Sequence, residues 1–178
     1  MLELLGIEFD VLVTGVHEVC AGPPRDVVLE NARRKAWAGW EASGAGATVL
    51  GVDTDVALDG QTLGKPADVG DARLRLEALS GRTHEVLSGV VVVEGTAGER
   101  EPSERSAVAL SEVTFRDLGE DALARYLASG EWQDRAGAYA IQGLGSTLIA
   151  RVAGDFSNVV GLPVPTLTEL LPDLFRHD

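Results

Sequence analysis

The sequence is poor in cysteine and in long apolar runs, and each shortage excludes a class of protein. Cys20 is the only cysteine among 178 residues, so the chain cannot form an internal disulfide, which fits a reducing compartment. No apolar stretch approaches the roughly 18 residues of a membrane span, and Met1–Leu5 lacks the basic region of a signal peptide. We therefore expect a cytoplasmic protein that has no membrane partner.

Positive charge is scarce as well. The sequence holds 28 Asp and Glu against 15 Lys and Arg, for a formal net charge of -13. Such a surface repels a nucleic-acid backbone, so we expect no nucleic-acid partner. A polyanionic small molecule can bind only in a local positive pocket or together with a divalent cation.

Lysine occurs at only two positions, Lys35 and Lys65, whereas the other cationic side chains are arginines. A compact ammonium and a planar guanidinium are not interchangeable, so two lysines kept in an arginine-rich chain suggest a specific task. Asp53 ends an apolar run, and Lys65 lies between Gly64 and Pro66 in a tight segment. A carboxylate and a lysine in an acidic chain point to phosphate chemistry assisted by a metal cation.

Apolar periodicity and turn residues predict alternating strands and helices. The predicted strands are Ile7–Val13, Ala47–Val52, Val86–Val93, Ala107–Phe115 and Leu148–Val152, with a hairpin turn at Asp59-Gly60. The predicted helices run from Pro23-Pro24 to the glycines at 44–46, over Asp71–Leu79, over Asp121–Ala128, and over Pro165–Phe175 with Thr166 or Thr168 as its N-cap. We expect one domain over residues 1–178, with an α/β fold in which helices flank a mixed, twisted sheet.

Each candidate residue also has an ordinary structural interpretation. Asp53 is equally well explained as a turn former at a strand exit, and a solvated loop residue is the more common explanation of a lysine such as Lys65. Lys35 is also explained as a residue on the solvent-exposed face of an amphipathic helix. The segments Gly137–Gly143 and Gly154–Pro163 are rich in small and turn-forming residues, which suits either close approach to a ligand or a simple connection.

Taken in series, these blocks resemble the Maf family of nucleoside triphosphate pyrophosphatases. Their order and spacing agree from about Leu2 to the last helix. The matching blocks are Val52-Asp53-Thr54, Leu58-Asp59-Gly60, Leu63-Gly64-Lys65-Pro66, Leu79-Ser80-Gly81 with His84, Thr114-Phe115, Ala136-Gly137-Ala138-Tyr139, Ile141-Gln142-Gly143 and Gly154–Pro163. The resemblance implies the α/β fold shared by Maf proteins and inosine triphosphate pyrophosphatases.

The resemblance implies hydrolysis of a nucleoside triphosphate to the monophosphate and pyrophosphate, with a divalent metal such as Mg²⁺ or Mn²⁺. Asp53 matches the proton acceptor proposed for the family, and Lys35 and Lys65 match its phosphate-contacting lysines. Glu18 matches an acidic position that, with Asp53, is associated with the metal. The resemblance also suggests a homodimer.

Two further positions bear on the base of the nucleotide. Thr54 and Gln142 are similar to the branch of the family that handles dTTP and UTP. The branch that handles 7-methyl-GTP usually has Asp-Gln at the first of these sites. The resemblance therefore implies a pyrimidine nucleotide as substrate.

The sequence departs from the family pattern at its beginning. Met1–Ile7 matches the end of a helix that, in the family, follows a strand and a phosphate-gripping Ser-x-Ser-x-Arg-Arg loop. Two further possibilities therefore stay open. The protein is catalytically impaired and serves nucleotide binding or septum interaction, or the true start codon lies upstream and the gene product carries the missing loop. Asp55 also replaces an apolar residue of the family, and Arg135 replaces a lysine.

Overall fold

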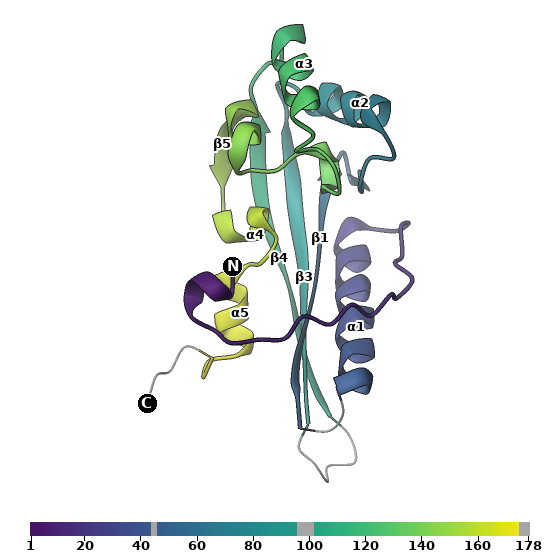
Figure 1. Cartoon of the computed structure of the whole chain (residues 1–178), viewed down its shortest axis with the longest axis vertical. Helices are drawn as coiled ribbons and strands as arrows, with labels where there is room; N and C mark the ends of the chain where they lie inside the picture. Colours follow the sequence, from purple (N-terminus) through teal and green to yellow (C-terminus); the bar gives the residue numbers. More distant parts are fainter. Residues whose placement is uncertain (44–45, 96–101, 175–178) are drawn as a thin grey trace.

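A twisted sheet of five strands is the frame of the protein in a computed structural model that describes residues 1–43, 46–95 and 102–174 (Figure 1). The strand order across the sheet is β2-β1-β3-β4-β5. The strands are β1 (Thr48–Leu58), β2 (Gln61–Thr62), β3 (Thr83–Glu94), β4 (Ser103–Phe115) and β5 (Ile149–Ala153). With the helices that flank this sheet, the α/β fold class is confirmed.

Every strand pairing among the described residues is antiparallel, which corrects the expected mixed sheet. Alternating strands and helices suggested that some strands pair in parallel, and α2 (Val69–Leu79) is a helix that connects two strands. The strands that α2 connects, β2 and β3, do run in the same direction, but β1 lies between them and pairs antiparallel with both. A crossover helix therefore produces no parallel pair here.

Two predicted local features of the sheet are confirmed. Asp59 and Gly60 both have positive φ, as a two-residue hairpin turn requires, and they join β1 to β2. β3 and β4 form the predicted antiparallel pair, with a register from Thr83 opposite Thr114 to Glu94 opposite Ser103.

The helices gather at two ends of the sheet. α1 (Pro24–Ser43) lies along its lower part in Figure 1, whereas α2 and α3 (Glu120–Ser129) lie at its upper end. α4 (Phe156–Val160) and α5 (Val164–Leu170) follow β5. Single 3₁₀ turns or short 3₁₀ helices lie at Glu3–Leu5, Ala136–Ala138 and Gly143–Leu148. Within the described ranges, no helix combines the length and the apolar character that crossing a bilayer needs.

The predicted strand at Ile7–Val13 is wrong. In the described part of the chain this segment pairs with no strand, and it crosses the sheet as an extended connection toward α1 (Figure 1). Its alternating apolar side chains stay outside the core, since Val11 is 79% and Val13 91% exposed. Alternating apolar side chains form a strand only where the backbone can pair with a neighbouring strand and the apolar face can pack against the core.

The last helix is shorter than its pattern predicts. α5 begins at Val164 with Pro163 as its N-cap, so neither Thr166 nor Thr168 caps it, and it ends at Leu170. Proline at the first turn fixes a helical φ and needs no N–H donor, which outweighs the capping preference of threonine. The predicted end at Phe175 lies outside the described residues.

Two glycines let α1 lie directly on the sheet. A Cβ on Gly51 of β1 would stand 2.3 Å from the carbonyl oxygen of Ala32, and one on Gly89 of β3 would stand 2.3 Å from that of Val28. Because real Cβ atoms do not approach that closely, only glycine permits this contact between helix and strands. The contact brings the N-terminal half of α1 beside the middle of β1, where Asp53 lies.

The largest group of buried apolar side chains lies at the other end of the sheet. Leu76 of α2, Phe115 of β4 and Tyr126 of α3 are each at most 2% exposed and belong to one cluster. This core supports the loops that form the far side of the cleft described below.

Candidate functional site

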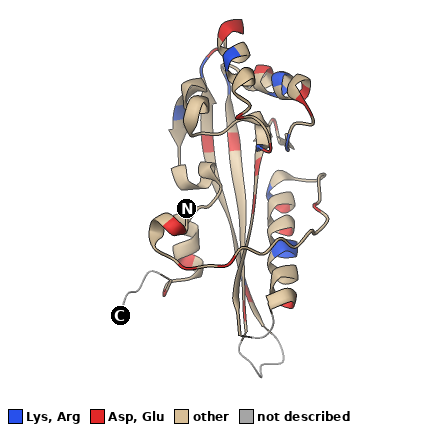
Figure 2. Ribbon diagram, in the orientation of Figure 1, with Lys and Arg blue, Asp and Glu red and all other residues tan. Residues whose placement is uncertain are grey.

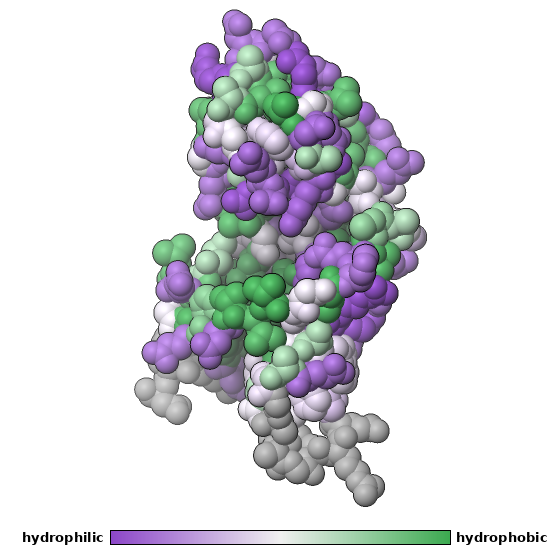
Figure 3. Space-filling view, turned by 45° about the vertical axis from the view of Figure 1, so that its right-hand side comes forward, coloured by the Kyte–Doolittle hydropathy of each residue, from purple (hydrophilic) through white to green (hydrophobic). Residues whose placement is uncertain are grey.

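A cleft of about 870 Å³ lies between α1 and the loops at the upper end of the sheet. Figure 3 shows the surface hollowed at this level, with hydrophilic side chains along its rim. All six residues that the sequence suggested for the site line this cleft: Glu18, Lys35, Asp53, Thr54, Lys65 and Gln142. The fold thus brings together residues that are up to 124 positions apart in the chain.

One side of the cleft is built on the ammonium group of Lys35. Its Nζ lies 2.5 Å from Oδ1 of Asp53 and 2.7 Å from Oε1 of Glu18, so it bridges β1 and the segment before α1. Burial alone would lower the pKa of Lys35, but its hydrogen bonds to both carboxylates outweigh burial and raise the pKa above its usual value. The hydrogen bond from Lys35 in turn lowers the pKa of Glu18. Lys35 is therefore a permanent cation, and Glu18 an anion, at neutral pH.

Asn31 holds this group together, and sequence reasoning did not assign it a role. Its Nδ2 donates to Oδ2 of Asp53 at 3.1 Å and to the Val19 carbonyl at 3.0 Å, while its Oδ1 accepts from the Val19 N–H at 2.7 Å. Asn31 is only 4% exposed. It lies four residues before Lys35 on the same helix face, and that spacing was the only sequence signal for it.

Lys65 enters the cleft from a loop that is fixed at Gly64. The Gly64 N–H donates to Oδ1 of Asp55 at 3.0 Å, and its carbonyl accepts from Nη1 of Arg75 at 2.7 Å and from the Gly137 N–H at 2.9 Å. Gly64 has a φ of 60°, which favours glycine. Among the described residues, the Lys65 ammonium forms no hydrogen bond or ion pair, so its charge is available to a ligand.

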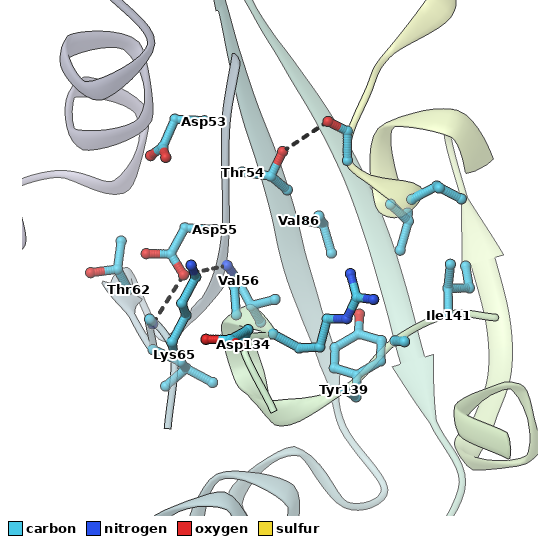
Figure 4. A pocket seen from close by; sticks show the side chains of 18 of the residues that line it. Asp53, Thr54, Asp55, Val56, Thr62, Lys65, Val86, Asp134, Tyr139 and Ile141 are labelled. Carbon is cyan, nitrogen blue, oxygen red and sulfur yellow. Dashed lines mark hydrogen bonds between the residues drawn. The ribbon is translucent and has the colours of Figure 1, made fainter. Parts of the chain in front are cut away.

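Asp55, which departs from the family pattern, has a structural task. Figure 4 shows Asp53 and Asp55 on one side of β1 and Thr54 on the other. Burial raises the pKa of Asp55, although hydrogen bonds from the Val56 and Gly64 N–H groups oppose that effect. Its carboxylate therefore organises the loop that presents Lys65.

Thr54 faces the opposite part of the cleft. Its Oγ1 lies 2.7 Å from Oγ of Ser88 on β3 and 3.5 Å from the carbonyl oxygen of Gly161, at the end of α4 (Figure 4). Val86, Tyr139 and residues 159–161 line the same part of the cleft. This part is mostly apolar, in contrast to the charged group around Lys35.

Gln142 stands on a loop that Glu131 anchors. The two carboxylate oxygens of Glu131 accept from the N–H groups of Leu144 at 3.0 Å and Gly145 at 3.1 Å. Gly143 has a φ of 65°, and a Cβ there would stand 2.8 Å from Oε1 of Glu131. No sequence pattern pointed to Glu131, because it lies 13 and 14 residues before the two N–H groups that it binds.

A buried aromatic group supports the same wall. Nε2 of His84 lies 2.8 Å from the hydroxyl of Tyr139, and both rings pack edge-on against Phe115. Burial lowers the pKa of His84 to about 4 and raises that of Tyr139. Both side chains are therefore neutral at physiological pH.

The residues present supply only some of the ligands that a divalent cation needs. No group of three or more His, Cys, Asp or Glu side chains in the described ranges could hold a metal by itself. Oxygens of Asp53 and Glu18 do converge on one point, the Lys35 ammonium, so they are close enough to share a cation. Mg²⁺ typically binds through one or two carboxylates and completes its shell with water and substrate phosphates. The donor set fits that mode of binding.

These features define an α/β protein whose cleft is charged around Lys35 and mostly apolar around Thr54. Figure 2 shows that α1, which carries Lys35, bears both acidic and basic residues. Residues 1–174 match the family described as Maf-like protein. The chain belongs to the Maf family.

Relatives of known name agree with this membership. A protein of Methylococcus capsulatus named dTTP/UTP pyrophosphatase is 43% identical over 98% of this chain and 84% of its own length. One of Anaeromyxobacter dehalogenans with the same name is 46% identical over 96% of this chain and 86% of its own length. A protein of Xylella fastidiosa named nucleoside triphosphate pyrophosphatase is 40% identical over 96% of this chain and 90% of its own length.

Proposed function

We propose that this protein hydrolyses dTTP and UTP to the monophosphate and pyrophosphate. The names of its relatives support this activity. The observation that carries the proposal is the presence in one cleft of the Asp53–Lys35–Glu18 group and of Lys65, a cation that no other described residue binds by a hydrogen bond or ion pair. A triphosphate needs cations along its chain, and its hydrolysis needs a base that accepts the proton of the attacking water.

Asp53 is the proposed general base. A water molecule beside its carboxylate attacks the α-phosphorus, the bond from that phosphorus to the bridging oxygen of the β-phosphate breaks, and pyrophosphate leaves. The proton of the water passes to Asp53. Lys35 and Asn31 fix the orientation of this carboxylate, and a base must be oriented before its pKa matters.

Lys35 and Lys65 are the proposed phosphate contacts. Lys35 stays protonated because its pKa is raised. Where a divalent cation such as Mg²⁺ or Mn²⁺ is bound, Asp53 and Glu18 would hold it, and it would neutralise charge that develops on the phosphates.

Thr54 and Gln142 are the proposed base contacts, because both line the cleft and Thr54 lies on the side of β1 opposite Asp53 (Figure 4). The amide of Gln142 can donate and accept hydrogen bonds, so it can pair with the polar edge of a pyrimidine. We expect dTTP and UTP to be good substrates and 7-methyl-GTP a poor one.

The test is pyrophosphate release from dTTP, UTP and 7-methyl-GTP by the purified chain, with Mg²⁺ or Mn²⁺ and with a chelator. Turnover of the two pyrimidine nucleotides that the chelator abolishes supports the proposal. Binding of dTTP without pyrophosphate release would instead support the non-catalytic nucleotide-binding alternative. A preference for 7-methyl-GTP would overturn the assignment of the base.

A further inference from the structure

The hydroxyl of Thr54 is part of a short polar chain that crosses from the sheet to α4. Thr54 and Ser88 are directly opposite one another in the pairing of β1 with β3, and their hydroxyl oxygens are 2.7 Å apart. Ser88 is fully buried, at 0% exposure. On its other side, Thr54 reaches the carbonyl oxygen of Gly161 at 3.5 Å.

The positions of the two hydroxyl protons follow from counting donors and acceptors. Thr54 is the only side-chain partner of Ser88 within the described ranges, so a buried Ser88 satisfies its O–H by donating to Thr54. Thr54 then has one proton left, and the Gly161 carbonyl is a pure acceptor. This arrangement satisfies every donor, whereas the reverse direction leaves the Ser88 proton buried and unpaired.

The Gly161 carbonyl is held in place independently of Thr54. Asn158, which is fully buried, donates from Nδ2 to the Val86 carbonyl at 3.0 Å and to Oγ of Ser111 at 3.0 Å. The hydroxyl of Ser111 also donates to the Asp155 carbonyl at 2.9 Å. α4 and the turn that ends it are therefore anchored to β3 and β4, and they keep Gly161 facing Thr54.

We propose that Ser88 and Gly161 fix the Thr54 hydroxyl as a hydrogen-bond acceptor toward the cleft, and that the site thereby selects bases with a donor at N3. Thymine and uracil share an N3–H donor, whereas N3 of cytosine is an acceptor. A lone pair of Thr54 pairs with the former and repels the latter. Ser88 is a positioning residue in this scheme, because it acts only through Thr54.

Gln142 alone cannot make this distinction. Its side chain forms no hydrogen bond to another described residue, so the amide can rotate and present either its oxygen or its nitrogen to a base. A fixed acceptor at Thr54 cannot change its role in this way, so the site as a whole still distinguishes the two kinds of base. The inference rests on the proposed function, since it concerns the base of the same nucleotide.

The test measures binding, so it does not depend on turnover. Dissociation constants for the non-hydrolysable α,β-imido analogues of UTP and CTP are determined by calorimetry with Mg²⁺. We expect UTP analogue to bind about tenfold more tightly than CTP analogue, the effect of one hydrogen bond gained or lost. Thr54→Ser keeps this ratio, and Thr54→Val brings it close to one.

Ser88→Ala is the decisive variant, and Ser80→Ala is its control. Both remove a serine hydroxyl, but Ser88 contacts Thr54, whereas Oγ of Ser80 accepts from the Leu118 N–H and takes no part in anchoring α4. Ser88→Ala removes one of the two contacts that hold the Thr54 hydroxyl, so the hydroxyl can rotate away from Gly161 and donate into the cleft. The ratio should then fall several-fold, mainly through tighter binding of the CTP analogue. Ser80→Ala leaves the ratio unchanged.

Three results would overturn the inference: equal or no binding of the two analogues by the unaltered protein, an unchanged ratio in Ser88→Ala, or an equal fall of the ratio in Ser80→Ala. Pyrophosphate release from UTP is measured on the same preparations. A protein that binds the two analogues selectively without turnover contradicts the proposed function and leaves the inference standing.

Discussion

At the scale of single residues, two carboxylates that are two positions apart on β1 have different partners and therefore different roles. Asp53 is bound by Lys35 and Asn31, whose side chains both come from α1. Asp55 instead accepts from the backbone N–H groups of Val56 and Gly64. One carboxylate therefore belongs to the charged centre of the cleft, and the other belongs to its frame.

This difference predicts different effects of the same substitution. Asp53→Asn removes the proposed base, and loss of a general base typically lowers the rate by about 10²–10⁴-fold. Asp55→Asn keeps an oxygen that can accept from both N–H groups, so we expect kcat for dTTP to fall by less than about tenfold, the effect of one modest hydrogen bond. Steady-state kinetics and thermal midpoints of both variants check this prediction. Near-normal turnover in Asp53→Asn would show that Asp53 is structural.

At the scale of elements, the contact between α1 and the sheet positions the charged end of the cleft. Gly51 permits this contact, and α1 carries both Asn31 and Lys35. A displacement of α1 therefore moves the two side chains that orient Asp53. The register of β1 with β3 similarly places Ser88 opposite Thr54.

We predict that Gly51→Ala impairs stability and activity together. Its methyl group would overlap the backbone of Ala32 and Ala36, and overpacking of this kind typically costs about 1–3 kcal/mol of unfolding free energy. We expect kcat/KM for dTTP to fall as well, because α1 moves. Gly119→Ala is the control, since a Cβ there meets nothing within 4 Å. Denaturant titrations with dTTP kinetics test the pair, and equal behaviour of the two variants would refute the prediction.

The same element contacts explain what the sequence could reveal. The scarcity of lysine and the resemblance to the family together suggested all six proposed site residues, and the fold places all six along one cleft. Asn31, Ser88 and Glu131 escaped, since their roles depend on helix–sheet packing, strand register and loop closure, which no local pattern encodes. The prediction at Ile7–Val13 failed for the opposite reason: its pattern is that of a strand, but no strand in the described ranges pairs with it.

At the scale of the whole molecule, burial of a histidine couples stability to pH. The folded-state pKa of His84 is about 4, against an unfolded value of 6.5, so the unfolded chain binds more protons between these values. The stabilisation from neutral His84 is therefore complete above pH 6.5 and is lost as pH falls toward 4. The full difference corresponds to about 3 kcal/mol of unfolding free energy.

Urea denaturation between pH 7 and pH 4 tests this coupling. We expect unfolding free energy to decline through this interval in the unaltered protein. In His84→Gln the decline should be shallower, because glutamine does not titrate and its amide can still pair with the Tyr139 hydroxyl. Parallel pH profiles for the two proteins would contradict the assigned burial effect.

The homodimer, the cytoplasmic location and the single domain over residues 1–178 stay predictions at this scale.

The alternation of side chains along β1 has an evolutionary consequence. Asp53 and Thr54 are adjacent in the chain, yet they face opposite parts of the cleft (Figure 4). With the roles proposed above, a substitution at position 54 changes which nucleotides are accepted and leaves the proposed base at position 53 unaltered. Insertion or deletion of a single residue in this strand has the reverse outcome, since it exchanges the two faces and forfeits both properties at once. Drift in substrate range should thus proceed here by point substitution and never by a change of length.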